Sequence, residues 1–149
     1  MSLIRTVARP LLASMFLSGG AHAIMNPERL APAAEPVVEE LADVPAVPRD
    51  VPTAIRLNGA VQVVAGSLLA LGRFQRLSAA ALACTLLPVT WAGHRFWETE
   101  DADERAQQRI HFLKNLSMLG GLLMTTADTG SGPSLTWRLA RRIPSPAHH

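Results

Sequence analysis

The chain has 149 residues, enough for one domain, and almost half of them (48%) are apolar. Its net charge of +2 is small and its arginines are scattered at segment ends, which excludes a typical nucleic-acid-binding surface. A single cysteine, Cys84, excludes an internal disulfide and a cysteine-based metal cluster. Gly-rich phosphate loops, HExxH zinc motifs and CxxCH haem-attachment motifs are also absent from the sequence.

The carboxylates are distributed very unevenly. All of them except Asp128 lie in two stretches, 28–50 and 98–104. The rest of the chain contains four acid-free apolar segments, at residues 10–25, 54–71, 77–93 and 112–127. A charge at the centre of a bilayer costs ~3 kcal/mol or more, whereas a soluble helix readily carries acids on its solvated face. The distribution therefore predicts an all-α, polytopic membrane protein built as a four-helix transmembrane bundle.

The first segment, 10–25, follows two arginines and begins at Pro10. Proline suits a first helical turn because its missing N–H would be unpaired there. A secretory signal is the alternative interpretation, since an A-x-A cleavage motif occurs at 21–23. The apolar run continues past this motif to Asn26 and Pro27, which favours a retained helix.

The connections between the segments differ in character. Residues 26–53 form an acidic, proline-rich loop in which residues 36–41 can make a short amphipathic helix on the membrane surface. The basic turn 72–76 is so short that it predicts a tight hairpin between the second and third helices. Residues 94–111 form a second acidic loop, and residues 128–149 form a basic tail.

The segments are short for membrane spans. At 1.5 Å per residue they make about 24–27 Å of helix, against a hydrocarbon core of about 30 Å. We therefore expect each helix to extend about one turn into its flanks. Glycines inside the segments, such as Gly20, Gly59 and Gly66, are interpreted as helix-packing positions, because small residues let backbones approach in lipid.

Four spans place both termini and the 72–76 turn on one side of the membrane and both acidic loops on the other. Lysine and arginine are equally numerous on the two sides but denser in the short flanks of the first side, which predicts cytoplasmic termini in a multi-pass protein of the plasma membrane. The tail, with Trp137 and Arg141, fits an anchor against anionic lipid. A disordered basic end is the alternative.

Polar side chains inside the predicted helices lie in the half of the membrane next to the acidic loops. They are His22, Asn58, Gln62, His94, Lys114 and Asn115, with the aromatic residues Trp91, Phe96 and Trp97 beside them. Intramembrane polar groups normally turn inward and pair with one another, so we predict a shared polar pocket that suits a quinone head group or a small oxyanion. The alternatives are helix–helix hydrogen bonds with interfacial snorkelling, and a haem held by His22 and His94.

Several motifs occur together along the chain. They are Gly93-His94-x-Phe96-Trp97, His111-Phe112-Leu113-Lys114-Asn115, Gly120-Gly121-Leu122-Leu123, Gly19-Gly20-Ala21-His22, Arg56-Leu57-Asn58-Gly59-Ala60 and Asp128-Thr129-Gly130. Their combination resembles the DoxX family, most closely its actinobacterial branch, over nearly the whole chain. The resemblance implies a four-helix integral protein of the plasma membrane. Many family members carry a glutamate on the second helix where this chain has Gln62, so a proton-carrying carboxylate is missing there.

The resemblance also implies a redox connection. Relatives are linked to thiosulfate:quinone or quinol-oxidase complexes, and to partners such as superoxide dismutase and a thiosulfate sulfurtransferase. We therefore hypothesise a membrane subunit of an oxidoreductase or of a thiol or oxidative-stress system, whose soluble partners supply the redox centres, because the sequence shows no evident electron carrier of its own. The alternatives are a membrane scaffold that anchors soluble redox proteins without its own chemistry, and a small-metabolite transporter.

Overall fold

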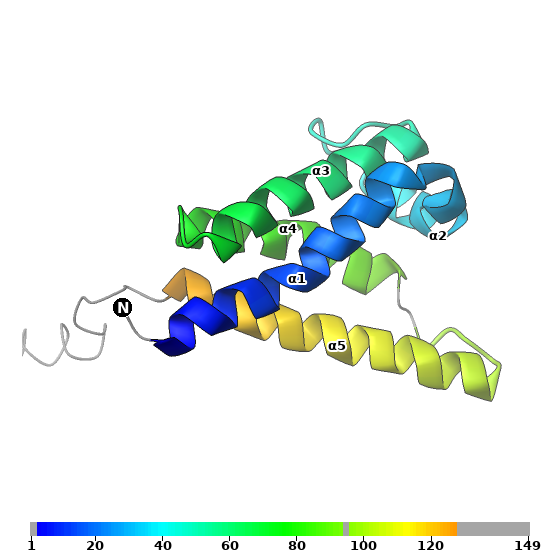
Figure 1. Cartoon of the computed structure of the whole chain (residues 1–149). Helices are drawn as coiled ribbons and strands as arrows, with labels where there is room; N and C mark the ends of the chain where they lie inside the picture. Colours follow the sequence, from blue (N-terminus) through cyan, green and yellow to red (C-terminus); the bar gives the residue numbers. More distant parts are fainter. Residues whose placement is uncertain (1–2, 94–95, 128–149) are drawn as a thin grey trace, which may run out of the picture.

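The computed structural model describes residues 3–93 and 96–127, with only the backbone of residues 91–93. All regular secondary structure in these residues is helical, which confirms the all-α prediction. The helices are α1 (Leu3–Met25), α2 (Pro27–Glu40), α3 (Val51–Ala70), α4 (Gln75–Gly93) and α5 (Ala102–Ala127) (Figure 1).

Two of the helices begin well before the apolar segments predicted for them. α1 starts at Leu3 and carries Pro10 inside it, although the sequence places Pro10 in the first turn. α5 starts at Ala102, within the stretch predicted as the second acidic loop. Asp101 explains this early start, because its Oδ1 accepts a hydrogen bond of 2.8 Å from the Glu104 N–H and so caps the helix. Acids in the first turn also favour the helix dipole.

The proline-rich stretch 26–53 contains a longer helix than expected. The sequence suggests a short helix at residues 36–41, whereas α2 has 14 residues and begins at Pro27. Proline is tolerated in the first helical turn, and the alanines and glutamates that follow are good helix formers. Val37 and Val38 are buried, and α2 packs against α3 and α4. Tertiary packing of this valine pair therefore supports a helix that contains two internal prolines.

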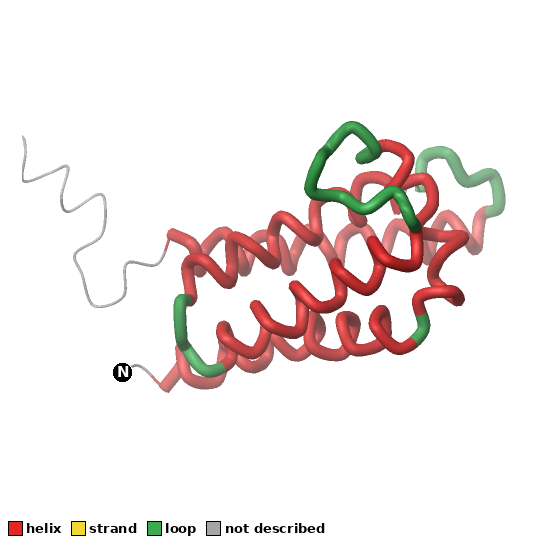
Figure 2. The backbone as a smooth tube through the Cα atoms, turned by 90° about the horizontal axis from the view of Figure 1, so that it is seen from above, coloured by secondary structure: helices red, strands yellow, loops and turns green. Residues whose placement is uncertain are grey.

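The four longer helices alternate in direction. α1 packs mainly on α3, α5 packs on α4, and α3 packs on α4. The start of α1, the α3–α4 turn and the end of α5 lie at one end of the molecule, which we call the basic end (Figures 1 and 2). α2 and the connection from α4 to α5 lie at the opposite, acidic end.

Small side chains fill much of the interior, whereas many large apolar side chains lie outside. The core consists of Ala13, Phe16, Ala65, Leu69, Ala79, Leu82, Ala83, Leu86 and Leu122. Large exposed side chains occur along the same helices, among them Leu11, Met15, Val64, Leu87, Leu116 and Met124. Small residues at helix contacts, with large apolar side chains outside, are typical of helix packing in lipid.

α1 and α3 approach each other most closely at two glycines. A Cβ atom added to Gly20 would lie 2.7 Å from the carbonyl oxygen of Gly59, and one added to Gly59 would lie 2.7 Å from that of Gly20. Atoms this close would overlap, so the two backbones can meet here only because both residues lack a side chain.

Helix length and hydropathy support one membrane span. Among the described helices, α3 alone is long and apolar enough to cross a membrane, with a mean hydropathy of 1.2. The prediction from the sequence has four spans. α1 and α5 carry more charged residues than α3, which has Arg56 alone, and these residues lower the mean hydropathy of the two helices.

Candidate functional site

Three of the predicted pocket residues lie on α1 and α3. Asn58 and Gln62 are half-buried on α3, one helical turn apart on the same face. A Cβ atom added to Gly19 of α1 would come within 3.7 Å of the Gln62 Oε1, so this amide lies against α1. His22 is exposed near the end of α1, and its Nδ1 lies 3.4 Å from Nδ2 of Asn26. This imidazole therefore pairs with the end of its own helix.

Two further pocket residues lie on α5. The Nζ atom of Lys114 is 3.5 Å from Nδ1 of His111, one turn earlier. Asn115 is only 5% exposed, and its side-chain amide makes no hydrogen bond with any other residue that the structure describes. In the described residues, every fully buried side-chain nitrogen or oxygen has a hydrogen-bond partner. Because the Asn115 amide has none, its atoms are not fully buried and open onto accessible space. Water can therefore reach this hydrogen-bonding group.

Three aromatic rings cluster where the connection from α4 meets α5. The ring centroids lie 5.1 Å apart for Phe96 and Trp97, 5.5 Å for Phe96 and Phe112, and 5.9 Å for Trp97 and Phe112. All three pairs meet edge to face, a favourable geometry for aromatic rings. The sequence predicts Phe96 and Trp97 as pocket walls but does not single out Phe112. The sequence does contain a feature that points to Phe112: it precedes Asn115 by three residues and so lies on the same face of a helix.

The described pocket residues lie on three helices. His22, Asn58 and Gln62 belong to the α1–α3 pair, whereas Lys114 and Asn115 belong to α5, which packs on α4. His94 and the side chain of Trp91 lie outside the described residues, and so does the predicted haem pair of His22 and His94. We call Lys114 and Asn115, with the three rings of Phe96, Trp97 and Phe112, the α5 site.

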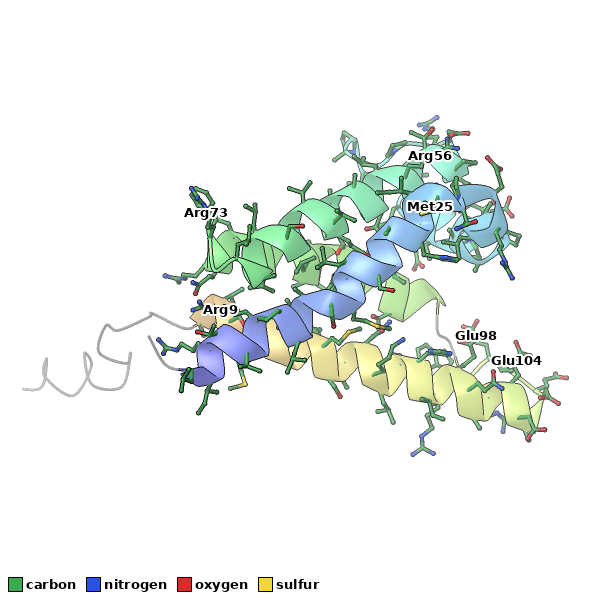
Figure 3. The ribbon with its side chains drawn as sticks, viewed as in Figure 1. Arg9, Met25, Arg56, Arg73, Glu98 and Glu104 are labelled. Atoms are coloured by element: carbon green, nitrogen blue, oxygen red, sulfur yellow. The ribbon has the colours of Figure 1, made fainter. Side chains whose placement is uncertain are left out.

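The acidic end also carries a groove of about 410 Å³. It is lined by Glu35, Val38, Glu39, Ala42, Arg49 and Val51, and by none of the predicted pocket residues. Glu98, Glu104 and Arg56 lie at this same end of the molecule (Figure 3). The carboxylates therefore surround the end of the helices as a charged rim, and the buried polar group of α5 is a separate feature.

Hydrogen bonds join three parts of the chain at the basic end. Nη2 of Arg9 donates to Oε1 of Gln75 over 2.8 Å, and Nε2 of Gln75 donates to the Gly72 carbonyl over 2.8 Å. Nε of Arg76 donates to the Thr126 carbonyl over 2.9 Å. A cation at the last turn of α5 is also favoured by the helix dipole. α1, the α3–α4 turn and the end of α5 are thereby held together.

The charged side chains of the described residues at this end are all arginines, whereas the acids lie at the other end (Figure 3).

A family model described as DoxX matches residues 4–95, which is more than half of the chain. The chain belongs to the DoxX family. The match confirms the resemblance seen in the motifs, and DoxX proteins are membrane proteins. The matched range runs from α1 to the end of α4, and the motifs of α5 lie beyond it.

The other two comparisons returned nothing: no curated protein sequence and no solved structure matches the chain.

Proposed function

We propose that this DoxX protein crosses the plasma membrane four times, with both termini in the cytoplasm. α1, α4 and α5 have 23, 19 and 26 residues, or about 35, 28 and 39 Å at 1.5 Å per residue, close to or above the ~30 Å of a hydrocarbon core. The large apolar side chains on their outer faces would contact lipid. The basic end, whose charged side chains in the described residues are all arginines, would face the cytoplasm, in keeping with the positive-inside rule.

Within this topology, we propose that the chain is the membrane subunit of an oxidoreductase or thiol-stress system and binds a quinone head group at the α5 site. The buried amide of Asn115 carries this proposal. Asn115 is only 5% exposed and makes no hydrogen bond with another described residue, and its amide reaches accessible space, so it can form a hydrogen bond with a ligand. A quinone carbonyl would accept a hydrogen bond from Nδ2 of Asn115.

The neighbours of Asn115 match the rest of a quinone. The ammonium group of Lys114, the next residue toward the start of α5, would supply a second donor. The rings of Phe96, Trp97 and Phe112 supply an apolar wall on which a flat head group can pack. A small sulfur oxyanion would use the two donors but not the rings, and the rings therefore favour the quinone.

Reduction of the bound quinone to a quinol takes up two electrons and two protons. The electrons would come from a reduced soluble redox protein, because the chain shows no electron carrier. Histidine exchanges protons near neutral pH, and His111 lies 3.5 Å from Lys114, so this pair would deliver protons to the quinone oxygens. The chain thus contributes binding, orientation and proton delivery to the reaction.

The α5 site is tested by Asn115→Leu in the full chain, purified into lipid nanodiscs. Loss of one hydrogen bond should weaken binding of a water-soluble quinone about tenfold, measured by quenching of tryptophan fluorescence. Ser117→Ala, on an exposed part of the same helix, is the matched control and should bind as the wild type does.

Equal quinone affinity of the wild type and Asn115→Leu would overturn the proposal that the α5 site binds a quinone. Saturable uptake of an anionic metabolite into proteoliposomes, without any redox partner, would instead support a transporter. Recovery of soluble partners that depends on the basic end but not on the α5 site would support a scaffold.

A further inference from the structure

An apolar groove of about 620 Å³ runs between α3 and α4 on the outside of the molecule. Val61, Val64 and Leu68 of α3 line it on one side, and Phe74 of the α3–α4 turn with Leu77 and Ala81 of α4 line it on the other. The one hydroxyl in its lining belongs to Ser78 and lies 3.5 Å from the Arg73 carbonyl as a weak hydrogen bond. The groove therefore offers an occupant apolar contact and almost no hydrogen bonding.

Small side chains create this groove. Ala60, Ala65 and Ala81 stand where larger residues would fill the space between the two helices. Along α3 the lining runs from Ala60 to Leu68, about 12 Å at 1.5 Å per residue. The groove is thus an open depression along the two helices, on a face that lipid would cover.

The α3–α4 turn places arginine at one end of the groove. Gly72 has φ +72°, and the Arg73 N–H donates to the Leu68 carbonyl over 2.8 Å, which closes α3 and reverses the chain. Phe74, with φ +48°, is 65% exposed at the mouth of the groove, directly after Arg73. Figure 3 shows the Arg73 side chain projecting from this end of the molecule.

Two guanidinium groups at the basic end, beside the α3–α4 turn, can accept an anion. The Arg73 side chain has no hydrogen bond or ion pair with another described residue. Arg76 uses its Nε on the Thr126 carbonyl, which leaves its Nη atoms for a further partner. Among the described residues no carboxylate lies at the basic end to neutralise them.

A second copy of the chain is a poor occupant of this groove. Two copies in one membrane that are related by an axis along the membrane normal would bring the same ends together. Arg73 and Arg76 would then face the same arginines of the other copy, and like charges repel. An anionic lipid, in contrast, carries an acyl chain for the groove and a phosphate for the arginines.

We propose that the α3–α4 groove binds an anionic phospholipid, with an acyl chain along the groove and its phosphate on Arg73 and Arg76. The proposal rests on the membrane insertion proposed above but is independent of quinone binding. Basic pockets between membrane helices are suited to anionic head groups, and one arginine near the membrane surface contributes about fivefold to such binding.

Native mass spectrometry of the full chain in detergent tests the head-group contact. Phosphatidylglycerol and phosphatidylcholine with identical acyl chains are added in equal amounts, and we expect the wild type to retain the anionic lipid preferentially. The double variant Arg73→Gln, Arg76→Gln should lose this preference, by about fivefold for each arginine. The matched control Arg29→Gln, Arg109→Gln removes two exposed arginines of the acidic half of the chain and should keep the preference.

A second pair of variants tests the groove itself. Ala81→Leu fills the groove and should reduce retention of both lipids, whereas Ala80→Leu, on the neighbouring exposed position outside the lining, should not. Equal retention of the two lipids by the wild type, or an unchanged preference in the arginine variant, would overturn the proposal. A dimer that Ala81→Leu abolishes, without any lipid adduct, would identify a second copy as the occupant.

Alkaline carbonate extraction of membranes separates the two proposals. A chain released by this treatment is not inserted, and the proposed membrane function fails. A chain that stays in the membrane but shows no preference for anionic lipid leaves the proposed function intact and overturns the lipid site alone.

Discussion

At the scale of single residues, the same amino acid has opposite consequences at different positions of this fold. Gly59 lies at the α1–α3 contact, where an added Cβ would come 2.7 Å from the Gly20 carbonyl oxygen. Gly120 lies on α5, and an added Cβ there would meet no atom within 4 Å. The sequence predicts a helix around each of these two glycines, and only the packing of the helices distinguishes them.

This contrast predicts opposite effects of one substitution. Gly59→Ala should lower stability by about 1–3 kcal/mol, because the overlap must be relieved by moving α1 away from α3. Gly120→Ala should raise stability by about 0.5–1 kcal/mol, because alanine favours the helix and meets no neighbour. Thermal unfolding of the purified full-length variants, followed by circular dichroism, measures both. A loss of stability in both variants would contradict the close contact assigned to Gly59.

At the scale of helices, the start of α3 depends on an exposed acid. The Oδ2 atom of Asp50 accepts a hydrogen bond of 2.9 Å from the Thr53 N–H. Hydrogen bonds from the Thr53 side chain and from its backbone N–H, with a smaller contribution from nearby Arg56, lower the pKa of the Asp50 carboxyl below its ordinary value. The carboxylate thus caps α3 where the acidic stretch ends and the apolar helix begins.

The lowered pKa fixes the sign of a pH dependence. The capping contribution of Asp50 is fully present above the pKa of an ordinary aspartate and is lost as pH falls through the lowered pKa of the folded state. Asp50→Ala should therefore melt at a lower temperature than the wild type at pH 7, and the difference should shrink as the solution is acidified below the ordinary aspartate range. Asp50→Asn keeps an oxygen that can cap the helix, so it should keep most of the stability without this pH dependence. A difference between Asp50→Ala and the wild type that does not change with pH would contradict the capping role.

At the scale of the whole molecule, charge and apolar surface are arranged along a single direction. Arginines gather at the end with the α3–α4 turn, acids gather at the end with α2, and large apolar side chains cover the outside between them. This arrangement suits a protein with one end on each side of a membrane. It also places the candidate quinone site in the half of the molecule toward the acidic end and the candidate lipid site toward the basic end.

The proposed orientation can be measured by labelling single cysteines in intact cells. In a Cys84→Ala background, Glu98→Cys should react with a membrane-impermeant maleimide added outside, because it lies at the acidic end. Arg73→Cys should react only after the cells are opened, because it lies at the basic end. Equal labelling of the two positions from outside would contradict the four-span topology, and the reverse pattern would place the termini outside.

The sequence alone determined the helical class, the family and the separation of acids from apolar segments. These features follow from local composition and from motifs, and both can be read without knowing which helix touches which. Helix starts were less predictable, because Asp101 caps α5 within a stretch that looks like an acidic loop, and because buried valines hold α2 as a helix despite its prolines.

The tertiary structure decided which helices pack together. In the sequence, His22, Asn58, Gln62, Lys114 and Asn115 all belong to the same half of the predicted helices, which suggests one pocket. In the structure, His22, Asn58 and Gln62 lie on α1 and α3, which pack together, whereas Lys114 and Asn115 lie on α5, which packs on α4 and carries Phe112 of the aromatic cluster. The helical repeat shows which residues share one face of a helix. It does not show which other helix packs against that face, because this depends on contacts between residues far apart in the chain.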